Sequence, residues 1–297
     1  MTEPAIAEAA GETTVAPTRS LVSDAWRDLR RKPIFWASSI IIAILVLMAV
    51  FPRLFTRADP YACQLRNSLL SPSGDHWFGT NLQGCDIYAR VVYGARASLE
   101  VGFLSVVGVA IIAILLGMAA GYYGGWSDAL IARVTDIVLG IPLLLGAIVI
   151  LSSVDLPSVW PVVLALALLG WTTATRIVRS SVIAAKQQDY VQAARMLGAN
   201  NRRIMGRHIA PNAMAPVIVI LTITLGQFIA VEATLSFLGI GVKGNTITWG
   251  KDIAAATARV TTSLGPVLFP STFLALTVLA FIMLGDAVRE AFDPKLR

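Results

Sequence analysis

The chain has 297 residues, of which 56% are hydrophobic and only 14% are charged, and its mean hydropathy is +0.71. Because about a quarter of the residues in a soluble domain are charged, this composition excludes an ordinary soluble globular protein. The net charge of +6 is compatible with a nucleic-acid partner or with a phospholipid surface, and the positions of the charges must decide between them.

Long apolar stretches predict six transmembrane helices, since about 20 apolar residues cross the hydrocarbon core of a bilayer. In chain order, the predicted spans cover residues 34–51, 101–120, 129–151, 159–175, 213–231 and 264–285. These stretches are apolar all round and too long for core helices or for the alternating strands of a transmembrane barrel. The predicted fold is an all-α integral membrane protein.

The remaining segments complete the predicted organisation. Residues 1–25 are expected to form a disordered cytoplasmic tail, because they are rich in Ala, Thr, Glu and Pro without periodicity. The other predicted parts are the first span with its basic flank (26–52), an extracytoplasmic loop (53–97), a five-helix core (98–285) that includes a long cytoplasmic loop between the fourth and fifth spans (176–212), and a cytoplasmic C-terminal tail (286–297).

The distribution of positive charge sets the predicted orientation. Of the 24 Lys and Arg residues, 16 lie on the side that holds both termini and residues 176–212. Since Lys and Arg near the spans mark the cytoplasmic side, both termini are predicted to be cytoplasmic. Topology then accounts for the positive charge, and the lipid bilayer rather than nucleic acid is the predicted partner.

The chain has two cysteines, Cys63 and Cys85, and both fall in the predicted extracytoplasmic loop. Disulfides persist outside the cytoplasm, so this placement predicts a Cys63–Cys85 bridge worth about 3 kcal/mol in the loop-entropy description. Two free thiols remain the alternative. A zinc site is disfavoured because His76 is the only histidine nearby.

Residues 176–212 are long for a connection between two spans. Gln192 follows Asp189 by three residues, which resembles a capping box and predicts Asp189 as the N-cap of a helix over 190–197. Gly198 is expected to end that helix.

A second short helix is predicted after this glycine, with Asn200 as its N-cap and Pro211 as its end. Ala193 and Ala194 leave one side of the first helix almost bare, which lets another backbone approach closely. Two interpretations stay open. The arginines of the loop bind anionic lipid, or the first helix docks a cytoplasmic partner.

The sequence of this loop resembles the EAA loop of binding-protein-dependent ABC importer permeases. Gly198 and Pro211 keep the spacing of that loop, whereas Gln192 stands in place of the usual Glu and Ala210 in place of the usual Leu. The implied docking role therefore does not include a salt bridge from position 192. The implied ATPase-coupling residues are Asp189, Tyr190, Gln192, Ala193, Ala194, Arg195, Gly198, Ala199, His208, Pro211 and Asn212.

From about residue 26 onward, the chain resembles the C-type permease subunit of dipeptide, oligopeptide and nickel importers. The segments that carry this resemblance are 76–80, 93–99, 121–128, 133–136 with 141–142, 232–241 with 248–250, and 285–297. The resemblance implies a bacterial inner-membrane permease that imports peptides. Nickel and glycosides are the alternative cargoes.

The same resemblance implies a set of partners: a second permease, two ABC ATPase subunits and an extracytoplasmic peptide-binding protein. ATP and Mg²⁺ would be bound by the ATPases, and this chain would be a non-catalytic subunit without a cofactor. The sequence agrees, since it contains no Gly-x-x-x-x-Gly-Lys-[Ser/Thr] motif.

Few polar residues lie within the predicted spans, and each carries an expectation. Asp136 is expected to pair locally with Arg133. Glu232 is expected either to bond to neighbouring helices or to line the translocation path. Pro142 is expected to kink the third span. The triplet Gly117, Gly121 and Gly125 is expected to allow close helix packing.

Other function classes fit the sequence less well. A secondary transporter would show repeats between its halves, and none is visible. An intramembrane enzyme or a metal site would need clustered polar side chains at depth, but His76 and His208 lie outside the predicted spans and far apart in the sequence.

Overall fold

The computed structural model describes residues 26–292. The predicted tail at 1–25 and residues 293–297 of the predicted C-terminal tail lie outside this part. The described residues form helices joined by loops and contain one isolated bridge, between Thr80 and Asp86. Five of these helices are long and apolar enough to cross a membrane, or six spans result if one bent helix pair is counted as a span. This agrees with the predicted all-α membrane fold.

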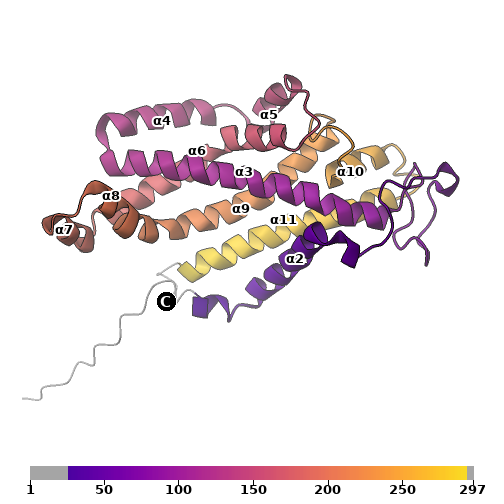
Figure 1. The fold of residues 1–297 in the computed structure, drawn as a ribbon, viewed down its shortest axis with the longest axis horizontal. Helices are drawn as coiled ribbons and strands as arrows, with labels where there is room; N and C mark the ends of the chain where they lie inside the picture. Colours follow the sequence, from indigo (N-terminus) through magenta and orange to yellow (C-terminus); the bar gives the residue numbers. More distant parts are fainter. Residues whose placement is uncertain (1–25, 293–297) are drawn as a thin grey trace, which may run out of the picture.

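The long helices are α2 (Pro33–Val50), α3 (Ile87–Tyr123), α6 (Trp160–Lys186), α9 (Ala210–Phe237) and α11 (Gly265–Phe292). The shorter elements are η1 (Pro52–Leu54), η2 (Leu65–Asn67), α4 (Gly125–Leu139), α5 (Leu143–Ser152), α7 (Asp189–Met196), α8 (Asn201–Arg203), the π-helical turn η3 (Ile204–Ile209) and α10 (Trp249–Thr257). Figure 1 shows the long helices running along the longest axis, with α7 and α8 at one end and α10 at the other.

Several helices extend beyond the predicted spans. Helix α3 begins at Ile87 inside the predicted loop 53–97, and α6 continues to Lys186 inside the predicted loop 176–212. Charged residues such as Arg90 and Arg179 end an apolar window, but they do not end a helix that continues past the hydrocarbon core. Residues 87–97 and 176–186 of the two predicted loops are therefore helical.

The third predicted span is broken rather than kinked. Helices α4 and α5 meet at an angle of 81° around residues 140–142. Pro142 stands at the N-cap of α5, where the lack of a backbone N–H costs nothing, because helix N-termini have no intrahelical partner for that group. The position of the irregularity was predicted correctly, and its size was not.

Glycines set the close packing of α3 against α6. A Cβ atom on Gly117 would lie 2.5 Å from Val178 Cβ, and one on Gly121 would lie 2.8 Å from the Arg179 carbonyl oxygen. These two glycines confirm the expectation of close packing. Gly125 does not take part, because it lies in a left-handed turn at φ +55° with open space around it.

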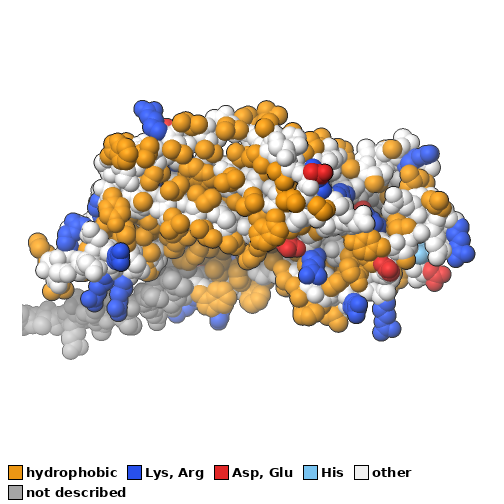
Figure 2. Space-filling view, turned by 45° about the horizontal axis from the view of Figure 1, so that its top comes forward, with side chains coloured by type: hydrophobic (Ala, Val, Ile, Leu, Met, Phe, Trp, Pro, Cys, Tyr) orange, Lys and Arg blue, Asp and Glu red, His pale blue; other side chains and the backbone are white. Residues whose placement is uncertain are grey.

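The outer surface of the bundle is strongly apolar. Large hydrophobic side chains such as Ile40, Phe103, Leu115 and Leu164 are more than half exposed. On the face drawn in Figure 2, apolar side chains cover most of the middle, whereas most Lys and Arg side chains lie toward the two ends. This distribution matches the predicted surroundings of lipid in the middle and water at the ends.

Candidate functional site

Helix α7 begins one residue earlier than the capping box predicts. Gln188 is its N-cap, in an extended conformation and without a side-chain cap bond, and Asp189 is the first helical residue. The predicted cap at Asp189 was therefore wrong, because a residue that is already helical cannot cap its own helix. Asp189 instead places a negative charge in the first turn, where the helix dipole favours it.

The end of α7 agrees with the prediction. Gly198 adopts φ +81°, and the amide of Ala199 donates to the carbonyl of Ala194 at 3.0 Å, as in a glycine-terminated helix. Asn200 then caps the next helix, since its side-chain oxygen accepts a hydrogen bond from the Arg203 amide at 2.9 Å.

The second short helix does not end at Pro211. Helix α8 runs through the π-helical turn η3 directly into α9, and residues 201–237 form one continuous helical stretch. Pro211 lies in the first turn of α9, where proline is tolerated. Its neighbour Asn212 donates to the carbonyl of His208 at 2.7 Å. The helix therefore changes its pitch at η3 and continues through Pro211 instead of ending there.

The faces of α7 divide differently from the prediction. Val191 is fully buried and Ala194 is nearly so, whereas Ala193 is exposed, so only one of the two alanines faces the bundle. At the end of the helix, Met196 is 90% exposed and the C-cap residue Leu197 is 88% exposed, and Tyr190 in the first turn is 41% exposed. We call Tyr190, Met196 and Leu197 the apolar tip. Sequence reasoning did not single out Met196 and Leu197.

The surroundings of the apolar tip are basic. Arg195, Arg202 and Arg203 are exposed, and none has an ion-pair partner within the described part of the chain. The remaining predicted coupling residues lie on the same loop, with Gln192 exposed and Ala199 and His208 half-buried. The loop therefore presents an apolar surface with a positive border at one end of the bundle.

Two ion pairs fasten α4 to α6 near this end. Asp136 pairs with Arg176 at 2.6 Å, not with Arg133 as expected, and Arg179 binds Asp128 in a bidentate manner with one contact of 2.6 Å. The local pair with Arg133 was a reasonable expectation at helical spacing. The break at Pro142 instead lets α4 lie against α6 and supplies a partner 40 residues away.

The opposite end of the molecule carries the disulfide-bonded loop. Cys63 and Cys85 form the predicted disulfide. The loop also anchors the start of α3, because Asp86 accepts a hydrogen bond from the Ala89 amide at 2.7 Å. His76 Nδ1 lies 2.8 Å from the other Asp86 oxygen. His76 thus supports a helix cap, and no group of three or more potential metal ligands occurs within residues 26–292.

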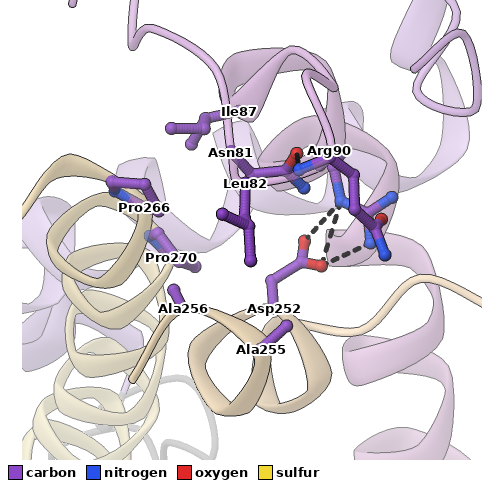
Figure 3. A pocket seen from close by; sticks show the side chains of 10 residues that line it. Asn81, Leu82, Ile87, Arg90, Asp252, Ala255, Ala256, Pro266 and Pro270 are labelled. Carbon is purple, nitrogen blue, oxygen red and sulfur yellow. Dashed lines mark hydrogen bonds and ion pairs between the residues drawn. The ribbon is translucent and has the colours of Figure 1, made fainter. Parts of the chain in front are cut away.

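A small cavity of about 120 Å³ lies beneath this loop, between α3, α10 and α11. Arg90 and Asp252 form its polar wall, with Arg90 Nε 3.0 Å from Asp252 Oδ1, and Pro266 and Pro270 of α11 lie opposite (Figure 3). Burial raises the pKa of the Asp252 carboxyl, and the Arg90 guanidinium opposes that shift. Sequence reasoning missed this pair, since its members are 162 residues apart.

Glu232 lies on the buried face of α9. It is 0% exposed, and its Oε1 atom accepts a hydrogen bond from the Ser236 hydroxyl at 2.7 Å. The other carboxyl oxygen has no hydrogen-bond partner among the described residues. The bond therefore lies within α9 itself and not between Glu232 and a neighbouring helix, and a role for Glu232 in the translocation path stays a prediction.

Comparison with known proteins identifies the family. The family described as "Binding-protein-dependent transport system inner membrane component" matches residues 113–297. The N-terminal TM domain of oligopeptide transport permease C matches residues 20–72. The chain belongs to the permease family of binding-protein-dependent transport systems. This permease is thus a multi-pass membrane component of an ABC importer.

Individual relatives resemble the permease over nearly its whole length. It is 39% identical to the dipeptide transport system permease protein DppC of Alkalihalophilus pseudofirmus, over 96% of this chain and 92% of that one. It is 37% identical to the oligopeptide transport system permease protein OppC of Bacillus subtilis, over 100% and 97%.

Solved structures agree on the fold. A chain of the MetNI methionine ABC transporter, in an inward-facing conformation, matches this permease with a TM-score of 0.54 and 18% identity. The match covers 68% of this chain and 96% of that chain. At this level of identity, the likeness supports the shared helical architecture only.

Proposed function

We propose that this permease carries dipeptides and oligopeptides into a bacterial cell, as a translocation subunit of the inner membrane with both termini in the cytoplasm. The full-length similarity to dipeptide and oligopeptide permeases supports the cargo class. The excess of Lys and Arg on the side of the termini supports the orientation. Nickel and glycoside cargoes are less favoured, because the relatives named above are peptide systems.

The observation that carries the coupling role is the apolar tip. Met196 and Leu197 are almost fully exposed outside the spanning helices, and exposed apolar groups of this kind mark interaction sites. We infer that an ABC ATPase subunit covers the tip and that closure of two such subunits moves the α7–α8 loop. The chain itself is proposed to be non-catalytic, because it has no phosphate-binding Gly-x-x-x-x-Gly-Lys motif.

The complete proposed assembly has this chain beside a second permease, with two ATPases on the cytoplasmic side and a peptide-binding protein outside. ATP and Mg²⁺ would be bound by the ATPases. A tagged chain purified from its own membranes tests this assembly. We expect it to bring down a second six-span protein and a protein with a phosphate-binding loop.

Reconstitution of that complex into lipid tests the cargo. We expect ATP hydrolysis to rise when the purified extracytoplasmic binding protein is added with a mixture of dipeptides to pentapeptides. Nickel ions and simple glycosides serve as the competing ligands in parallel reactions. Stimulation by one of them but not by peptides would overturn the cargo, and absence of any ATPase in the purified complex would overturn the whole proposal.

A further inference from the structure

Tyr122 joins three elements at the end of the molecule that carries the apolar tip. Its side chain is 4% exposed, and its hydroxyl donates a hydrogen bond of 2.7 Å to the side-chain oxygen of Asn201 at the start of α8. Lys186, at the end of α6, donates to the Tyr122 carbonyl oxygen at 2.6 Å and lies 5.4 Å from the centre of the Tyr122 ring. The ends of α3, α6 and α8 thus meet at one tyrosine.

These contacts supply hydrogen-bond partners to two groups of Tyr122, its carbonyl oxygen and its hydroxyl, that would be costly to leave unpaired. The last carbonyls of a helix lack intrahelical partners, and a cation at this end is favoured by the helix dipole, so Lys186 stabilises the end of α3. A buried tyrosine hydroxyl also needs a partner, and Asn201 supplies it. The Tyr122 hydroxyl and carbonyl groups are therefore both hydrogen-bonded although they lie at the edge of the bundle.

The hydrogen bond between Tyr122 and Asn201 differs in kind from the other contacts between the loop and the bundle. Residues 189–203 are seated on the bundle mainly by apolar packing, with Val191 fully buried. Among residues 26–292, the Tyr122–Asn201 contact is the only side-chain hydrogen bond that links 189–203 to a distant helix. Apolar contacts tolerate sliding, whereas a hydrogen bond weakens steeply with distance and angle.

Helix α3 connects this contact to the opposite end of the molecule. Gly117 and Gly121 hold its last turns tightly against α6, and its 37 residues span roughly 55 Å at about 1.5 Å per residue. At the far end, Arg90 of α3 binds Asp252 of α10 at the wall of the cavity (Figure 3). One continuous helix therefore runs from the loop to the cavity (Figure 1).

We propose that Tyr122 is a positioning residue that converts movement of the α7–α8 loop into movement of α3, so that the state of the ATPases reaches the Arg90–Asp252 cavity. This inference rests on the proposed function, because the loop must be moved by a docked ATPase. The hydrogen bond from the Tyr122 hydroxyl to Asn201 fixes the position of α8 relative to α3. The packing of the buried Tyr122 ring contributes the remaining contact between the loop and α3.

The test uses the complete transporter in lipid and a reporter in the cavity. Ala255 is exposed and lines that cavity, and the two native cysteines are joined in the disulfide, so Ala255→Cys places a single free thiol in this chain. The rate of maleimide labelling of this chain is measured without nucleotide and after trapping with ATP and vanadate. We expect the two rates to differ in the otherwise unchanged chain.

Tyr122→Phe removes only the hydroxyl, and Tyr123→Phe is the matched control, because Tyr123 is 59% exposed and its hydroxyl has no partner among the described residues. We expect the control to keep the labelling response. Tyr122→Phe should reduce the response about fivefold, the factor that corresponds to one net hydrogen bond of about 1 kcal/mol. ATP hydrolysis should continue, so that fewer peptides are carried per ATP.

Substitutions of the exposed residue Asn201 test the same hydrogen bond from its acceptor side without changing a buried side chain. Asn201→Asp keeps an acceptor oxygen and should retain the response, whereas Asn201→Leu should reduce it about fivefold, as Tyr122→Phe does. The double variant with Tyr122→Phe should be no worse than Asn201→Leu alone, because both remove the same bond.

Three results would overturn the link: a full response in Tyr122→Phe and Asn201→Leu, an equal loss in Tyr123→Phe, or a wild-type transporter that hydrolyses ATP without any change at the cavity. Failure of the proposed function would look different, since the unsubstituted complex would then contain no ATPase and show no nucleotide response to compare.

Discussion

Gly198 combines an unusual backbone conformation with open surroundings. Its φ of +81° disfavours any residue with a Cβ, while nothing lies within 4 Å of the place where a Cβ would stand. The requirement for glycine at this position is therefore conformational and not steric. A substitution of Gly198 should therefore change the backbone conformation of the loop without creating a steric clash.

Gly198→Val should disturb the end of α7 at a cost of at least about 1–2 kcal/mol, because a left-handed conformation is unfavourable for residues other than glycine. We expect peptide uptake and coupled ATP hydrolysis to fall severalfold, with a normal amount of protein in the membrane. Transport of labelled peptides in membrane vesicles measures this. Gly206→Ala is the control, since Gly206 has open space around it and no positive φ. Normal uptake by Gly198→Val would contradict the docking role of the loop.

Glu232 is held in a short polar relay inside the bundle. It accepts a hydrogen bond from Ser236, and the Ser236 oxygen accepts in turn from the Val242 amide at 3.3 Å, which fastens the turn after α9. Glu232→Gln should preserve this relay, because an amide oxygen can accept the same bond. Glu232→Leu should lower the free energy of unfolding by about 1–3 kcal/mol.

Thermal unfolding of the purified protein in detergent checks the Glu232 prediction, with the exposed Thr234→Val as a control. A further comparison addresses the translocation path. If Glu232→Gln has normal stability but strongly reduced uptake, the carboxyl group is needed for more than its hydrogen bond to Ser236 and the path role gains support. Equal stability of the Gln and Leu variants would instead remove the structural role of the relay.

At the scale of elements, the apolar tip of α7 is exposed, and none of residues 26–292 covers Met196 or Leu197. Leu197→Ser removes a large apolar side chain that is 88% exposed, so it should not disturb folding. We expect the amount of ATPase recovered with a tagged permease to fall at least severalfold. Leu65→Ser, at a residue that is 79% exposed in the disulfide-bonded loop at the other end, is the matched control and should recover normal ATPase. Equal recovery by both variants would contradict the docking surface.

The link between α3 and α10 gives a prediction about stability. The side chains of Arg90 and Asp252 are only 16% and 12% exposed, so Asp252→Ala would leave a nearly buried arginine without its partner. The expected cost is about 3–5 kcal/mol. Asp155→Ala breaks the pair with Lys243, in which Asp155 is 95% exposed, and should cost about 0–1 kcal/mol. Denaturation of both variants in the same detergent measures the difference, and equal losses would contradict it.

At the scale of the whole molecule, the spans were predictable because each is an apolar stretch that depends on no distant residue. The disulfide was predictable because two cysteines in one loop leave a single pairing. The partner of Asp136 was not predictable, since the 81° break between α4 and α5 decides what lies beside it. Tyr122 and Asn201 were missed for the same reason, as each looks ordinary in its own segment. Local signals thus predicted the elements, and long-range geometry determined most of the polar contacts.

The disulfide has a consequence for how the protein matures. In the proposed orientation, Cys63 and Cys85 become oxidised only after their loop has crossed to the oxidising side of the membrane, and a chain inserted upside down would keep two thiols in a reducing compartment. The oxidation state of each molecule therefore records which way it was inserted. A maleimide mass tag added to freshly lysed cells should separate correctly inserted molecules, which stay unshifted, from inverted ones, which gain two tags. Placing extra lysines in the outer loops should increase the tagged fraction, and this provides a count of insertion errors from a single gel.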